Sequence, residues 1–297
     1  GDQIDRMSRS QDMDKDEGST LEIFYLFYYL DMLARRVGGR VFTILGNHEI
    51  MNVEGDMRYV SDGEFKSFKR QLSDVYVRNS LYPLNSRTLK NSKYQLLKSR
   101  SRKRIKHNTK HNNTKMAGKD GGEYVNNHIY NDNDKDNEFP EGYRERLYAF
   151  APSGMCANYL GYTGYVILQI GNWLFCHGGP TLRTLKTYSA DLINSIVSMY
   201  LLGIESKQKM IEKSFDDIVY SSAMDDRGIM WDRTFGSSND NTYSQNMKLD
   251  KILDEYNRLN GNISEETKAK YVAIGHTPQM EHGINRSEEH TSELQSR

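Results

Sequence analysis

The sequence predicts an α/β fold. Short apolar runs of strand length, at 41–45, 173–176 and 271–274, alternate with longer segments whose apolar residues recur at helical spacing. Each of these runs is followed within two residues by a glycine and by a polar side chain. Near-continuous apolar strands are typical of parallel sheets, and α/β proteins bind ligands just beyond the carboxyl ends of such strands. We therefore expect the strand ends to form one site.

The N-terminal region is predicted to contain half of a βαβ unit. A polar segment ends in Ser19-x-x-Glu22, the capping-box pattern, and a helix should follow. The strand at 41–45 comes next, so Asp2 and Asn47 are expected at the same edge of a parallel sheet. The apolar face of the helix is predicted to consist of Phe24, Phe27, Tyr28 and residues 30–33.

The remaining strands and helices are predicted from the same two patterns, short apolar runs and apolar residues at helical spacing. Strands at 165–170 and 173–176 are joined by Gly171-Asn172, which indicates a hairpin turn. A last strand is expected at 271–274. Further helices are predicted around 65–76, 144–150, 191–202 and 249–259.

The amino-acid composition limits the kinds of binding partner and compartment that we expect. Lysine plus arginine and aspartate plus glutamate are 40 each, so the charge balance gives no reason to expect nucleic acid as an obligate partner. No apolar run has the length of a transmembrane segment. The only two cysteines, Cys156 and Cys176, make no disulfide framework and are expected to be small buried residues, which fits a reducing compartment.

We expect residues 1–285 to form a single domain that contains a low-complexity insert. From about residue 85 to 138 a basic run is followed by Asn-, His- and Lys-rich sequence and then by an acidic stretch. This insert has too little apolar surface to offset the entropy of ordering, so it is predicted to be disordered. The alternative is a nucleic-acid arm or localisation signal at Lys103-Arg104, although the acidic stretch can neutralise it.

The natural chain is expected to extend beyond both ends of this one. Residues 286–297 resemble the translation of a common sequencing adaptor. The natural chain is therefore expected to be cut short near Asn285. The chain opens inside what looks like a motif, Gly1-Asp2-Gln3-Ile4-Asp5-Arg6, so the true N-terminus is expected upstream.

Four residues are candidate metal ligands: Asp2, Asn47, His177 and His276. A carboxylate, an amide oxygen and two imidazoles suit Mn, Fe or Zn better than a thiolate-binding ion or Ca. A single histidine is more often a hydrogen-bonded polar residue than a ligand, but the repeated strand, glycine and histidine pattern favours ligands here. Two such divalent ions can share a hydroxide, with Asp2 as the bridging ligand, and activate it for in-line attack on phosphorus.

The neighbouring residues supply the other parts of such a reaction. His48 is the candidate general acid to the leaving oxygen, and Asp5 could orient its imidazole. Arg6 offers the planar guanidinium that binds phosphate oxygens in a bidentate manner. A second arginine is expected, either Arg233 in Trp231-x-Arg233 or Arg227; the sequence leaves that choice open.

The motifs now amount to a family resemblance. GD-x-[IV]-DR at 1–6, GNHE at 46–49, HGG at 177–179 and GHT at 275–277, in this order, resemble the metal-dependent phosphoprotein phosphatases of the calcineurin-like superfamily. The segments at 51–59, 231–233 and 275–279 are more similar to the Shewanella-like protein phosphatases. The resemblance implies a central β-sandwich flanked by α-helices, a two-metal centre and hydrolysis of phosphomonoesters on proteins, at Ser/Thr or Tyr.

The chain departs from the family pattern at two points. The family's first motif, GD-x-H-G, which brings two ligands to the first metal, does not occur, and Met7 stands where the family usually has glycine. We predict that this chain alone holds its first metal poorly and is nearly inactive. Two rival functions remain: a nucleotide or dinucleoside polyphosphate hydrolase of the same superfamily, and a catalytically inactive module that binds phosphoproteins.

Overall fold

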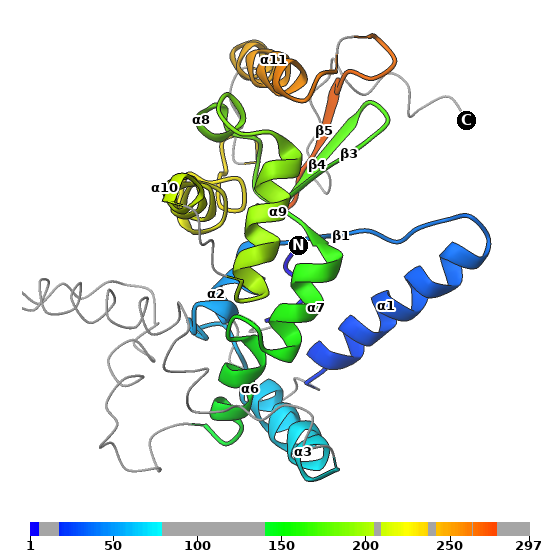
Figure 1. Cartoon of the computed structure of the whole chain (residues 1–297), viewed down its shortest axis with the longest axis vertical. Helices are drawn as coiled ribbons and strands as arrows, with labels where there is room; N and C mark the ends of the chain where they lie inside the picture. Colours follow the sequence, from blue (N-terminus) through cyan, green and yellow to red (C-terminus); the bar gives the residue numbers. More distant parts are fainter. Residues whose placement is uncertain (6–17, 79–139, 205–208, 237–241, 263, 278–297) are drawn as a thin grey trace, which may run out of the picture.

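The computed structural model describes residues 1–5, 18–78, 140–204, 209–236, 242–262 and 264–277 (Figure 1). Four of the features predicted above lie outside these residues: Arg6, Met7, the insert at about 85–138 and the adaptor-like segment 286–297. No helix in the described ranges is long and apolar enough to cross a membrane.

The strands form two small sheets. β1 (Thr43–Ile44) pairs in parallel with β2 (Gly164–Tyr165). β3 (Ile167–Ile170) and β4 (Trp173–Cys176) form the predicted antiparallel hairpin, and β5 (Tyr271–Ala273) pairs in parallel with β4. The mixed α/β class is therefore confirmed, whereas the β-sandwich stays a prediction because the described strands form sheets of two and three strands.

The predicted helices are present, and the structure adds several that were not predicted, at 47–53, 155–163, 182–185, 209–219 and 220–224. All four helices predicted downstream of β1 are present, with ends shifted by a few residues. A helix that was not predicted, α2, begins at Asn47, so Asn47 and His48 occupy the first turn of a helix and not a loop. The helices are α1 (Thr20–Arg36), α2 (Asn47–Val53), α3 (Asp62–Arg78), α6 (Tyr143–Phe150), α7 (Met155–Thr163), α8 (Leu182–Leu185), α9 (Ala190–Leu201), α10 (Lys209–Val219), the π-helical η2 (Tyr220–Met224) and α11 (Thr242–Leu259).

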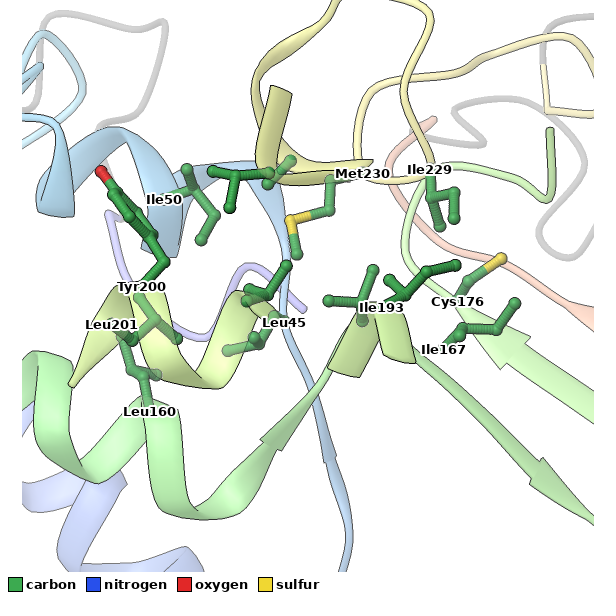
Figure 2. Close-up of a cluster of buried hydrophobic side chains, with 14 of the residues drawn as sticks. Leu45, Ile50, Leu160, Ile167, Cys176, Ile193, Tyr200, Leu201, Ile229 and Met230 are labelled. Atoms are coloured by element: carbon green, nitrogen blue, oxygen red, sulfur yellow. The ribbon is translucent and has the colours of Figure 1, made fainter. Parts of the chain in front are cut away.

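The hydrophobic core surrounds α9, which contacts α7, α10 and β3 (Figure 1). Figure 2 shows core side chains of α9 together with those of α7, β3, β4 and α2 and with Leu45, which follows β1. Leu45 and Ile50 are 1% and 2% exposed, so apolar residues that are each worth about 1.5–3 kcal/mol on burial hold both sides of segment 46–49. The core therefore fixes the position of the GNHE turn.

The prediction for α1 was right in position and partly wrong in packing. Phe24 is buried and stacks on Tyr159 with ring centroids 4.6 Å apart. The capping box does not form: Ser19 makes no side-chain cap, and Glu22 accepts a hydrogen bond from Gln71 Nε2. Tyr28 is 56% exposed, because α1 extends away from the body of the protein (Figure 1) and only one edge of its apolar face finds a partner.

The two cysteines are buried free thiols, as predicted. Burial raises the pKa of Cys156 to about 12, and it also raises the pKa of Cys176. Both side chains therefore behave as small apolar residues of the core.

Candidate metal centre

The structure brings the four candidate ligands together. His177 follows β4 and His276 follows β5, and these parallel strands are joined beyond their ends by a hydrogen bond from the Gly275 amide to the His177 carbonyl (2.8 Å). Nε2 of His177 lies 2.9 Å from Asp2 Oδ2, 3.0 Å from Asn47 Oδ1 and 3.2 Å from His276 Nδ1. Their role as metal ligands stays a prediction, but their convergence on one point is a feature of the fold.

Glu49 fixes the loop that carries Asp2. Its fully buried carboxylate accepts hydrogen bonds from the amides of Gly46 (2.7 Å), Asp2 (3.0 Å) and Gln3 (2.7 Å). Asp2 Oδ1 in turn accepts one from the His48 amide (3.2 Å). Any side chain at position 46 would collide with Asp2, so glycine is required there. Glu49 therefore fixes the shape of this loop.

Left-handed backbone conformations concentrate at the site. Asp2, Asp5 and His276 have φ of 56°, 65° and 58°, and Ser153 is the one further non-glycine residue with positive φ in the described ranges. Such a conformation costs on the order of 1–3 kcal/mol and persists only where surrounding contacts impose it. The structure thus stores strain at three residues that face the candidate site.

The four side chains suit a divalent cation. Burial, together with the charges of Arg233 and His177, lowers the pKa of His276 to about 4, so its imidazole is neutral near pH 7. Burial alone would raise the pKa of Asp2, but hydrogen bonding and charge from His177, with the charge of His48, lower it. A single proton on His177 Nε2 can satisfy one of its three neighbours, whereas a cation can be bound by all of these donor atoms. His276 Nε2, moreover, is buried without a hydrogen-bond partner.

In the described ranges, Asp2, His177 and His276 are the one group of three or more potential His, Cys, Asp or Glu ligands that lie close enough to hold an ion. Asn47 adds a fourth donor to the same point. The described residues therefore bring candidate ligands for one metal ion to one point.

His48 lies beside this cluster and is paired with Asp5. Its Nδ1 is 3.3 Å from Asp5 Oδ2, and the ring of Tyr59 packs against its imidazole at 4.9 Å between centroids. Burial alone would lower the pKa of His48, but the hydrogen bond to Asp5 and the charges of Asp2, Asp5 and Glu49 raise it above its ordinary value. The expected pairing of Asp5 with His48 is thus present.

Sequence reasoning missed Arg146, a fully buried arginine of α6. Its Nη2 donates to Asp5 Oδ1 (2.9 Å), its Nη1 to Glu64 Oε2 (2.8 Å) and its Nε to Asn52 Oδ1 (2.9 Å). The signal that could have found it is a charged residue on the apolar stripe of a helix, between the buried Tyr143 and Phe150.

The candidate phosphate-binding arginines are not equally placed. Arg233 is exposed, and its charge contributes to the lowered pKa of His276, so it lies within electrostatic reach of the cluster. Arg227 is 85% exposed and lies 3.7 Å from Asp226. Arg233 is the better candidate on this ground, and its role stays a prediction.

One segment of the chain is similar to a protein phosphatase. It is 46% identical over 52 residues to Shewanella-like protein phosphatase 2 of Arabidopsis thaliana, which is 18% of this chain and 13% of that protein. A segment of 49 residues, 16% of this chain, is 47% identical to an uncharacterized protein of Schizosaccharomyces pombe and covers 15% of it. No family model matches the chain.

The solved structures that resemble this fold include the cold-active protein tyrosine phosphatase of a psychrophilic Shewanella species, with a TM-score of 0.44 and 19% identity. A second structure of a cold-active protein tyrosine phosphatase gives a TM-score of 0.47 and 18% identity. Each match covers 87% of this chain, and the chain spans about half the length of those proteins.

Proposed function

We propose that this chain is a metal-dependent phosphomonoesterase that acts on phosphoproteins, with the calcineurin-like fold. The observation that carries the proposal is the convergence of Asp2, Asn47, His177 and His276 around one point, with His48 beside it. The local similarity to a Shewanella-like protein phosphatase supports the same class. A phosphoserine, phosphothreonine or phosphotyrosine side chain is the substrate class.

The four ligands would hold one divalent ion, Mn, Fe or Zn, with Asp2 shared with a second. Bound divalent ions supply Lewis-acid stabilisation of phosphoryl oxygens and activate water for attack. Within this chain, Glu49 holds the Asp2 loop against the start of α2, so the carboxylate and the amide of Asn47 face the same point.

His48 is the proton donor to the leaving oxygen. Its Nδ1 faces Asp5, which leaves Nε2 free to face the substrate and fixes the ring orientation. Arg6 and Arg233 are the proposed phosphate-binding residues, because a guanidinium binds two phosphoryl oxygens at once.

Metal binding is the first test. The metal-stripped chain is titrated with Mn²⁺ in a calorimeter, and we expect saturable binding that Asn47→Ala and His177→Ala weaken by about 10-fold or more. His107→Ala is the matched control, because it removes an imidazole outside the proposed ligand set. Equal affinity in all four proteins would contradict the metal site.

Turnover is the second test. With Mn²⁺ we expect slow hydrolysis of a fluorogenic aryl phosphate and of a phosphopeptide, because the described residues supply the ligands of one metal position. EDTA and His48→Asn should each abolish the hydrolysis. Preferential hydrolysis of diadenosine tetraphosphate would favour the nucleotide hydrolase, and phosphopeptide binding with no metal-dependent turnover would favour the inactive binding module.

A further inference from the structure

We infer that Arg146 is a positioning residue, which holds Asp5 and through it the imidazole of His48 in the orientation that proton donation requires. The inference rests on the proposed function of His48 and extends it to Arg146, whose hydrogen-bond partners in the described ranges are Asp5, Glu64, Asn52 and Thr20. It is carried by the hydrogen-bond geometry around one buried guanidinium.

The guanidinium is fully enclosed. It donates to Asp5, Glu64 and Asn52, and its central carbon lies 4.8 Å from the ring centroid of Phe68 and 4.9 Å from that of Phe150. Glu64 also accepts from the hydroxyl of Thr20 (2.6 Å). Three hydrogen bonds to three different side chains, together with full burial, hold the cation in one orientation.

Arg146 is hydrogen-bonded to both side chains that contact His48 here, Asp5 and Asn52. Asp5 Oδ1 is bound by Arg146, and this directs Oδ2 toward His48 Nδ1. A guanidinium has no acceptor, so the amide of Asn52 must offer its oxygen to Arg146 and turn its Nδ2 toward Asp5 Oδ2 (2.6 Å) and the His48 carbonyl (3.0 Å). The orientations of Asp5 and Asn52 both follow from one cation.

Stability alone does not explain this arrangement. A buried arginine with two carboxylates is frequently no more stable than apolar residues of the same volume, and the apolar stripe of α6 could be completed by a leucine or methionine. Asp5 also has a left-handed backbone with φ of 65°, which needs an external restraint. The bond from Arg146 holds the side chain of this residue, which orients His48.

The kinetic test uses Arg146→Met and Arg146→Lys with Mn²⁺ and aryl phosphates of different leaving groups. We expect kcat of Arg146→Met to fall about 10- to 100-fold with phenyl phosphate, whose leaving group needs a proton, and less than about threefold with 2,4-dinitrophenyl phosphate. KM should stay within about twofold of the wild-type value. A loss of equal size across the series would indicate a structural role and would overturn the inference.

The lysine variant covers the case in which Arg146→Met does not fold. Lysine keeps the charge but cannot reproduce the planar set of three hydrogen bonds, so we expect the same dependence on the leaving group with a smaller loss. Wild-type turnover of phenyl phosphate by Arg146→Lys would contradict the inference. Arg183→Met is the matched control: it removes an arginine whose 2.7 Å ion pair with Asp225 lies outside this network, and it should leave the leaving-group series unchanged.

A double-mutant cycle tests whether Arg146 acts through Asp5. If it does, Arg146→Met should cause less than about a twofold further loss of kcat in an Asp5→Asn background. Independent, multiplicative losses would overturn the inference.

A spectroscopic measurement separates this inference from the proposed function. The ring nitrogen signals of His48, identified by their loss in His48→Asn, are recorded for the metal-free chain at one pH. Arg146→Met should move the Nδ1 signal in the same direction as Asp5→Asn, even if the wild-type chain shows no metal-dependent turnover. An unchanged His48 signal would refute the positioning role, whereas absent turnover with a changed signal would refute the proposed function alone.

Discussion

Nε2 of His177 lies 3.0 Å from Oδ1 of Asn47, although 130 positions of sequence separate the two residues. The contact joins the end of β4 to the first residue of α2, so the candidate metal ligands come together only when both sheets and the core around Leu45 are in place. A cation at this point should therefore stabilise the whole fold.

The first prediction concerns this linkage. Added Mn²⁺ should raise the melting temperature of the metal-stripped chain, by the equivalent of about 2.7 kcal/mol when its concentration is about 100 times Kd. Asn47→Leu should remove most of this rise, because it deletes one ligand oxygen. Asn158→Ala, which removes an amide that donates to the Ser153 carbonyl, should keep the full rise in the same thermal melts.

The second prediction concerns Glu49. Glu49→Gln replaces an acceptor of three backbone amides by a group with one acceptor oxygen, so the free energy of unfolding should fall by about 2 kcal/mol. Mn²⁺ affinity should fall as well, since Asp2 loses its anchor. Urea denaturation and calorimetry measure the two effects. Glu145→Gln, at the 2.7 Å ion pair with Lys69, should change neither by a comparable amount, and an equal loss there would count against the anchoring role.

The third prediction concerns Tyr59, whose ring packs against His48. Tyr59→Phe keeps the ring and should retain kcat within about twofold. Tyr59→Ala removes an aromatic contact worth about 0.5–1.5 kcal/mol, so kcat should fall by about 3- to 10-fold if the contact holds the imidazole in place. Equal kcat for both variants in an aryl phosphate assay would show that the tyrosine does not orient His48.

The fourth prediction concerns pH and stability. The hydrogen bond from the amide of Val41, together with those from Arg35 and Arg40, lowers the pKa of Asp31 to about 2, although burial acts in the opposite direction. A lowered folded-state pKa gives stability that is present above the unfolded value of about 3.9 and is lost as pH falls toward 2.

Asp31→Asn should therefore lower the free energy of unfolding by about 1 kcal/mol at pH 7, a value reduced for solvent screening. The difference from wild type should hold from pH 7 to about 5 and shrink between pH 4 and 2, as measured by urea denaturation. Asp226→Asn is the control, because that side chain is 87% exposed and 3.7 Å from its nearest cation. A difference that is constant down to pH 2 would refute the assignment.

The convergence of the candidate ligands could be predicted from sequence, because His177 and His276 each come at the end of an apolar strand and next to a glycine. Parallel pairing of β4 with β5 then brings His177 and His276 to the same edge. The pairing of His48 with Asp5 followed from the motifs in the same way. Local sequence patterns were sufficient to predict which residues meet where the ends of paired strands are aligned.

Arg146 and α2 could not be predicted, for different reasons. The partners of Arg146 lie 82 to 141 positions away, and nothing local to α6 identifies them. The helix α2 is seven residues long and starts after a glycine with no capping side chain. It is held by Glu49 and by the core contact of Ile50, which are tertiary interactions. The exposed side of α1 was missed because amphipathic spacing identifies an apolar face but not its partner.

The buried thiols have a practical consequence. Cys176 immediately precedes His177, and Cys156 lies on α7, so a thiol reagent can reach either sulfur only when the surrounding core opens. The labelling rate of Cys176 therefore reports opening of the core beside the candidate ligands, and that of Cys156 reports opening around α7. If added metal slows the labelling of Cys176 more than that of Cys156, the ion binds near His177, and no substitution is needed to show it.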